Sequence, residues 1–177
     1  MQSKILIFSD SHGIGRDFSE TIKMLKKDIT HVLFLGDGYI NYTLCENTYD
    51  SIIFDCVPGN CDYNTKYPIV NRLNIGGKII LMTHGHQHNV KTTFERICSL
   101  AAENKADICL FGHTHTPTVF IHNNILFLNP GSISNSRNIN VPTYGIIEIT
   151  NDGKISYSLN GIFGKTHREL NGDEFVG

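Results

Sequence analysis

The chain has 177 residues, which suffices for one well-buried core but is short for two domains. Its formal net charge of -2 and its 18% charged residues give no basic surface, so we expect no general nucleic-acid binding. No apolar stretch approaches membrane-spanning length and the N-terminus is not typical of a signal peptide, which predicts a cytoplasmic protein without membrane contact.

The first apolar run, residues 4–9, predicts a strand covered on both faces. It ends at Asp10 and His12, which are followed by two glycines. A carboxylate and an imidazole released at a strand end can bind a divalent metal. A helix-capping aspartate beside a surface histidine is the simpler alternative. Residues 16–27 then place apolar side chains at helical spacing and predict an amphipathic helix.

Two further strand ends repeat this arrangement. Residues 31–35 predict a strand that leads into Asp37 between two glycines, and residues 51–57 predict one that leads into Asn60. Each of these polar residues, taken alone, is more simply explained as a turn former. The repetition at successive strand ends weakens that explanation.

Residues 67–75 and 78–83 read as two strands joined by a pair of glycines, a strong hairpin signal. The second strand leads into three histidines within five residues, His84, His86 and His88. Packing alone does not explain such a cluster. We expect His88 to be exposed and His86 to support a ligand or contact a substrate.

Residues 92–104 predict a helix, and the apolar run 108–111 predicts a buried strand that ends at Gly112. His113 and His115 follow, and residues two apart on extended backbone point the same way, which suits metal binding. Capping of the strand end is the alternative for this pair.

The last part of the chain consists of short strands separated by turns, which adds hairpins to the earlier strand–helix–strand units. We therefore predict an α/β fold, a four-layer α-β-β-α sandwich of two mixed sheets flanked by helices. Residues 1–160 are expected to form one domain. Residues 161–177, which are polar and contain glycine, are expected to be a weakly ordered tail.

Taken together, these motifs resemble those of the calcineurin-like metallophosphoesterases, and most closely those of the small bacterial and archaeal phosphodiesterases of that family. The likeness spans residues 5–132 and includes the closing motif 129–132, Asn-Pro-Gly-Ser. Several motifs in the family's order are far more specific than any one of them. The motifs are Asp10-x-His12, Gly36-Asp37, Gly59-Asn60, His84-Gly85-His86 and Gly112-His113-x-His115.

The resemblance implies a phosphodiesterase with a single domain of the family fold and two divalent metal ions. In this reading a metal-bridging hydroxide attacks the phosphoester, and Asp37 bridges the metals. The remaining ligands would be Asp10, His12 and His115 for the first metal, and Asn60, His84 and His113 for the second. Ligands of this kind suit Mn²⁺, Fe²⁺, Ni²⁺, Co²⁺ or Zn²⁺, and we favour Mn²⁺ because the relatives usually bind it.

The chain departs from the wider family at Cys61, where many members carry a histidine thought to protonate the leaving group. A thiol of ordinary pKa is a poor proton donor beside an anionic substrate. We therefore expect a preference for esters with good leaving groups, such as aryl phosphodiesters. Asp37, His86 and Cys61 are the residues predicted to take part in catalysis. Arg137 is a candidate phosphate contact, although a solvated surface arginine is the simpler reading.

Two other functions stay open at this point. A phosphomonoesterase would use the same centre, and a non-catalytic scaffold would resemble the retromer subunit that has this fold but has lost part of its metal site. The presence of every expected ligand type favours the enzyme. We expect a small phosphodiester substrate, and the resemblance leaves a homo-oligomer open.

Overall fold

The computed structural model describes residues 2–63 and 65–174 of the chain. Its strands form a six-stranded sheet in the order β11-β10-β9-β1-β2-β3 and a five-stranded sheet in the order β4-β5-β6-β8-β7. The strands are β1 Ser3–Phe8, β2 His31–Phe34, β3 Ile53–Cys56, β4 Val70–Ile75, β5 Lys78–Thr83, β6 Ile108–Leu110, β7 Pro117–His122, β8 Ile125–Pro130, β9 Thr143–Ile149, β10 Ile155–Phe163 and β11 Thr166–Glu169. The helices are α1 Arg16–Leu25, α2 Tyr39–Glu46 and α3 Glu95–Glu103, with 3-10 turns at His86–His88 and Gly172–Glu174.

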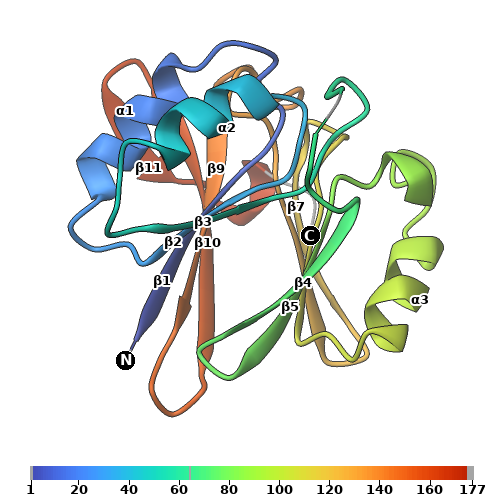
Figure 1. The fold of residues 1–177 in the computed structure, drawn as a ribbon. Helices are drawn as coiled ribbons and strands as arrows, with labels where there is room; N and C mark the ends of the chain where they lie inside the picture. The colour runs from blue at the N-terminus through green and yellow to red at the C-terminus, as the bar shows by residue number, and fades with distance from the viewer. Residues whose placement is uncertain (1, 64, 175–177) are drawn as a thin grey trace.

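The two sheets face each other and helices cover their outer faces, α1 and α2 on the first sheet and α3 on the second (Figure 1). Three apolar clusters hold these layers together. One lies between the sheets, one joins the six-stranded sheet to α1 and α2, and one joins the five-stranded sheet to α3. Phe18 of α1, Tyr42 of α2 and Ile97 of α3 are fully buried in these contacts. The predicted four-layer α/β sandwich is confirmed.

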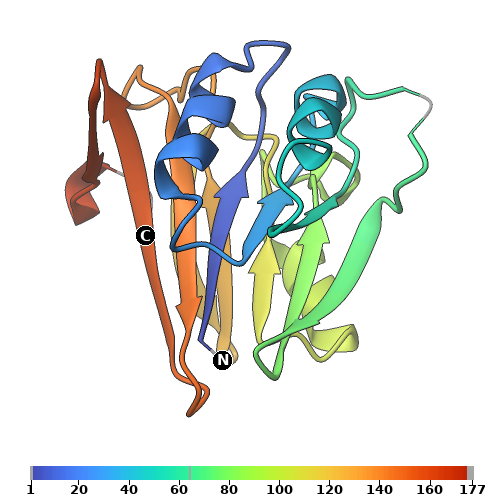
Figure 2. The ribbon, with the colours of Figure 1, turned by 60° about the vertical axis from the view of Figure 1, so that its left-hand side comes forward.

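Both sheets are mixed, and their parallel strands place the site loops. In the first sheet β1 pairs in parallel with β2 and β2 with β3, and in the second β5 pairs with β6 and β6 with β8. The carboxyl ends of β1 and β2 lie at the same edge of their sheet (Figure 2). Loops that leave parallel strands at one edge lie close together, which explains why residues far apart in sequence can meet.

The predicted hairpin of residues 67–83 is confirmed as β4 and β5, which pair in antiparallel register. The predicted helices are also present, each starting or ending within a few residues of its expected boundary. None of the helices in the described part of the chain is long and apolar enough to cross a membrane.

The structure corrects the prediction for the end of the chain. The boundary expected at residue 161 falls inside β10, so the expected tail contains the end of β10 and the whole of β11, which pairs with β10 along residues 166–169. Arg168 anchors this edge strand, since its guanidinium lies 4.1 Å from the ring centroid of Phe163 and 2.7 Å from Glu174. The prediction of weak order is therefore wrong for β11; residues 175–177 lie outside the described residues.

Candidate metal centre

Loops from four strands bring carboxylates and imidazoles together between the sheets. Their ligand atoms form two groups, and within each group all of these atoms lie within 4.8 Å of one another. The first group is Asp10, His12 and His115, and the second is Asp37, His84 and His113. The resemblance implies Asp10, His12 and His115 for one metal, Asn60, His84 and His113 for the other, and Asp37 between them; that these residues bind metal stays a prediction.

Asp37 lies between the two groups. Its Oδ2 atom is 3.9 Å from Nε2 of His12 and 3.5 Å from Nε2 of His84. A carboxylate that faces nitrogen ligands of both groups can contact a cation in either of them. This is the position expected of a bridging ligand.

Five of these six residues have a backbone conformation that residues other than glycine rarely adopt. Their φ angles are 56° for Asp10, 45° for His12, 58° for Asp37, 68° for His113 and 61° for His115. The left-handed region costs an ordinary L-residue roughly 1–2 kcal/mol. Such conformations persist where the surrounding structure enforces them, and they cluster at functional sites.

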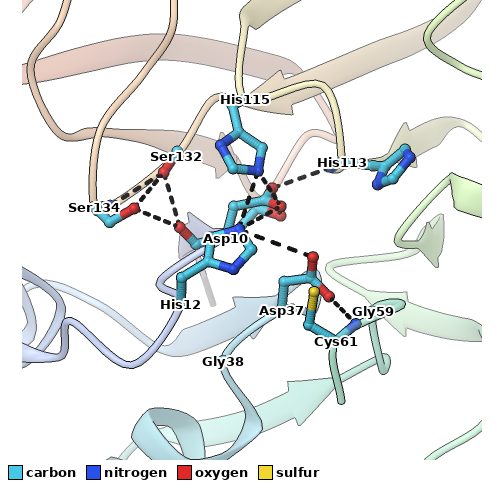
Figure 3. A network of polar contacts seen from close by, with 12 residues as sticks. Asp10, His12, Asp37, Gly38, Gly59, Cys61, His113, His115, Ser132 and Ser134 are labelled. Carbon is cyan, nitrogen blue, oxygen red and sulfur yellow. Dashed lines mark hydrogen bonds and ion pairs between the residues drawn. The ribbon is translucent and has the colours of Figure 1, made fainter.

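The backbone and one side-chain oxygen of Asp10 are held from several sides (Figure 3). Its N–H donates to the carbonyl of Gly36, and its own carbonyl accepts from the hydroxyls of Ser132 at 2.8 Å and Ser134 at 3.1 Å. Its Oδ2 accepts from the hydroxyl of Ser9 at 2.6 Å and from the amide of His113 at 3.1 Å. These contacts leave Oδ1 alone to face the centre.

Oδ1 of Asp10 is buried and has no hydrogen-bond partner among the described residues. Nε2 of His115 lies 3.1 Å from it, but the pair does not have hydrogen-bond geometry. Nε2 of His12 is in turn 3.1 Å from Nε2 of His115. Two imidazole nitrogens and a carboxylate oxygen that converge in this way form a donor set for a divalent cation.

His84 shows the same feature in the second group. Its side chain is fully buried, and Nδ1 donates a hydrogen bond to the carbonyl of Leu35 at 2.6 Å, because a carbonyl oxygen can only accept. Nε2 has no hydrogen-bond partner within the described chain. Metal-binding histidines commonly donate their second N–H to a backbone carbonyl, which fixes the tautomer. The residues present therefore fit a metal pair at this centre.

The ionisation of the second group is set by burial and by mutual contact. Burial alone would raise the pKa of Asp37, but the facing imidazole of His84 and the amide of Cys61 lower it well below its usual range. Burial, the charge of His84 and that of Lys91 lower the pKa of His113 to about 4. At neutral pH, Asp37 is ionised and His113 is neutral, the states in which both can bind metal.

Asp62 is a residue whose role the sequence reasoning missed. Its carboxylate accepts four backbone hydrogen bonds, from Asp37 at 2.7 Å and from Gly38, Tyr39 and Gly59 at 2.9 Å each. These contacts join the loop after β2 to the loop after β3. The acidic residue next to Cys61 was visible in the sequence, but nothing there showed which amides it would meet.

Cys61 and Asn60 lie at the open side of the centre. The amide of Cys61 donates to Oδ1 of Asp37 at 2.7 Å, and the thiol belongs to a third group of potential ligands with His12 and Asp37. Burial and the charge of Asp37 raise the pKa of this thiol. Asn60 is exposed and its Nδ2 donates to the Cys61 sulfur at 3.2 Å, so its role as a ligand stays a prediction.

The remaining candidates surround these groups. The ring of His86 lies 5.4 Å from that of His84 and 6.1 Å from that of His113, measured between centroids. His88, which was expected to be exposed, is only partly exposed, and its Nδ1 is buried. Arg137 is exposed, and its backbone N–H donates to the carbonyl of His115 at 2.9 Å, which places its backbone beside the first group.

Comparison with known proteins shows to which family the chain belongs. Residues 3–152 match the model of the calcineurin-like phosphoesterase superfamily domain. The chain is 31% identical over 149 residues to the probable metallophosphoesterase YsnB of Bacillus subtilis, an alignment that covers 84% of this chain and 85% of YsnB. This protein belongs to the calcineurin-like phosphoesterase superfamily.

Other similar proteins are a phosphodiesterase and two proteins with solved structures. Phosphodiesterase YfcE of Escherichia coli is 29% identical over 100 residues, which cover 52% of this chain and 50% of YfcE. A predicted phosphoesterase from Streptococcus pneumoniae has a solved structure that superposes with a TM-score of 0.76 at 30% identity, covering 96% of this chain and 98% of that one. Vps29 of Entamoeba histolytica, solved with zinc, has the same fold, with a TM-score of 0.77 at 22% identity over 94% of this chain and 97% of Vps29.

Proposed function

We propose that this protein is a metal-dependent phosphodiesterase that uses two divalent metal ions. The observation that carries the proposal is the convergence of two groups of ligand atoms on either side of Asp37. Unpartnered buried atoms, Oδ1 of Asp10 and Nε2 of His84, face this point within the described chain. Buried polar atoms rarely lack partners unless an ion or water supplies them.

When two divalent cations are bound, they supply Lewis-acid chemistry, lowering the pKa of bound water and compensating the charge of a phosphoester. In this proposal Asp10, His12 and His115 would hold one cation, and Asn60, His84 and His113 the other, with Asp37 shared. The two carboxylates reduce the charge of the cation pair. Oxygen and imidazole nitrogen ligands suit Mn²⁺, Fe²⁺, Ni²⁺, Co²⁺ and Zn²⁺, and we favour Mn²⁺ because members of the family usually bind it.

The protein's own residues would orient the substrate and handle its protons. His86 is partly exposed beside His84 and His113, and burial and the charge of His84 lower its pKa, so it is neutral at pH 7. A neutral imidazole at this place can donate a hydrogen bond to a phosphoryl oxygen. Cys61, with its raised pKa, stays a thiol and is a weak acid for a leaving group.

Two alternatives predicted from the sequence differ from this proposal in measurable ways. A phosphomonoesterase would prefer a substrate with one ester substituent. A non-catalytic scaffold with this fold would bind partners without hydrolysing either kind of ester. The six carboxylates and imidazoles that converge at the centre favour hydrolysis over the scaffold.

The test is hydrolysis of bis-p-nitrophenyl phosphate and of p-nitrophenyl phosphate by purified protein, stripped with chelator and then reloaded with each candidate metal. We expect activity only after metal is restored, highest with Mn²⁺ and higher on the diester. Equal rates with and without metal would refute a metal-dependent enzyme. A preference for the monoester would favour a phosphomonoesterase, and metal binding without hydrolysis of either ester would favour the scaffold.

A further inference from the structure

A cavity of about 250 Å³ opens directly beside the candidate metal centre. Its walls include His12 and Cys61, which share a group of potential metal ligands with Asp37. The other walls come from Gly13, after β1, and from Tyr39, Ile40 and Asn41 at the start of α2. A molecule whose phosphate lies at the centre can therefore extend into this cavity.

The cavity offers no positive charge to a ligand. No lysine or arginine is among its lining residues in the described chain. Its one carboxylate, that of Asp62, is directed at the four backbone amides that it accepts from. A second phosphate group would find no counter-charge in this cavity. An uncharged group would fit it better, because the one carboxylate in the wall already has hydrogen-bond partners.

Apolar and aromatic side chains form part of the wall. Ile40 is 73% exposed although it lines the cavity, so a large apolar surface is available to a ligand. Tyr39 packs edge to face against Tyr67, with 5.8 Å between ring centroids, and the hydroxyl of Tyr67 donates to Glu46 at 3.1 Å. The aromatic wall is therefore held in place before a ligand binds.

Further apolar side chains project from the same segments. Ile14 follows Gly13 and Tyr63 follows Asp62, and these side chains are 56% and 79% exposed. Exposed apolar residues that gather near a site commonly indicate a binding surface. Here these side chains add uncharged surface next to the cavity.

We propose that this cavity binds one flat, uncharged ring, an aryl group or a nucleobase, carried by an ester oxygen of a phosphodiester at the metal centre. The inference rests on the proposed function, since it needs the phosphate at that centre. The volume of about 250 Å³ is below the range of roughly 300–1,000 Å³ usual for drug-sized ligands and suits one ring substituent. A nucleic-acid strand, with further phosphates near the cavity, does not fit this description.

The experiment compares diesters that share p-nitrophenol as leaving group, so that leaving-group chemistry stays constant. The retained substituent is p-nitrophenyl, thymidine or methyl. If the cavity binds the retained ring, kcat/KM for the two ring-bearing esters should exceed that for the methyl ester by about tenfold. The ranking of the p-nitrophenyl and thymidine esters tells an aryl group from a nucleobase.

Two variants of wall residues test the location. Ile40→Asp adds a charge to the wall and Tyr39→Ala removes its ring, and each should lower kcat/KM for the ring-bearing esters about tenfold, mainly through KM. Leu44→Asp is the matched control, because it adds the same charge at an equally exposed residue of α2 that does not line the cavity. Equal loss on all three esters would place the leaving ring in the cavity and also support the proposal. Variants of Ile40 and Tyr39 that behave like Leu44→Asp would overturn it.

A binding measurement separates this inference from the proposed function. If the metal-loaded protein hydrolyses no ester, the function fails, and NMR titration with diphenyl phosphate and dimethyl phosphate still tests the cavity. Amide shifts at Gly13 and Asn41 with diphenyl phosphate alone would support ring binding. Identical shifts with both ligands, or none with either, would refute it.

Discussion

Nδ1 of His84 donates to the carbonyl of Leu35 at 2.6 Å, and this bond directs Nε2 toward Asp37, 3.5 Å away. Both contacts are made by a fully buried imidazole. The carbonyl belongs to the residue that follows β2, whereas His84 follows β5 of the other sheet. Packing of the two sheets thus fixes the orientation of a candidate ligand.

We expect His84→Gln to weaken Mn²⁺ binding by about 100-fold or more, since loss even of a group that orients a ligand costs 10–100-fold. Calorimetric titration measures the affinity. The rise in melting temperature that metal binding gives the parent protein should disappear together with the tight binding. His122→Gln, at an exposed histidine at the end of β7, is the control and should bind as the parent does. Unchanged affinity in His84→Gln would exclude this histidine as a ligand.

Asp62→Asn tests the hydrogen bonds that connect the loop after β2 to the loop after β3. An amide keeps one acceptor oxygen, but its NH₂ group would face backbone N–H groups that now bond to a carboxylate. Hydrogen bonds to charged groups contribute about 1.5–3 kcal/mol each, and we expect a loss of about 3 kcal/mol in the free energy of unfolding. Urea denaturation at pH 7 measures it.

The control for that variant is Asp173→Asn, an exposed aspartate near the end of the described chain, which should change stability by less than about 0.5 kcal/mol. Metal affinity should also fall in Asp62→Asn, because the backbone of Asp37 loses a contact. If both variants unfold at the same urea concentration, the four hydrogen bonds do not stabilise the fold.

The sequence predicted the strands and the residues that follow them because apolar runs and glycine-bounded ends are local signals. It did not predict the role of Asp62, because three of the four amides that this side chain meets lie about 25 residues earlier in the chain, as the separation to Asp37 shows. Strand β11 was missed for another reason. Thr166–Glu169 is polar, and only its pairing with β10 and the contact of Arg168 with Phe163 make it a strand. Nor does any local signal place Asp10 and His12 at positive φ.

Cys61→His tests the departure from the wider family. An imidazole at this position can protonate a leaving group, which the thiol with its raised pKa does poorly. We expect kcat/KM for dialkyl phosphates to rise by about 100-fold, the lower end of the usual effect of general acid catalysis. Aryl esters should gain less because their leaving groups need no proton. Cys61→Ser is the matched control and should show no gain; without a gain in Cys61→His, the account of this departure is wrong.

The ionisation of His113 predicts how the stability of the metal-free protein depends on pH. Its pKa is lowered to about 4 by burial and by the charges of His84 and Lys91, whereas an unfolded chain has an ordinary histidine pKa of about 6.5. Between these values the unfolded state binds more protons than the folded state. The free energy of unfolding must therefore fall as the pH drops from about 6.5 toward 4.

His113→Gln removes this group and should flatten that dependence. The two proteins are compared by urea denaturation in chelator at pH 7.5, 6 and 5, and the parent should lose more stability than the variant over this range. The lowered pKa values of His86 and His88 act in both proteins and cancel in the difference. His84, whose pKa is raised by Asp37 and Asp10 against the effect of burial, contributes with the opposite sign in both. Parallel curves for the two proteins would show that His113 does not titrate differently on folding, and that its neutral state at pH 7 is not set by the fold.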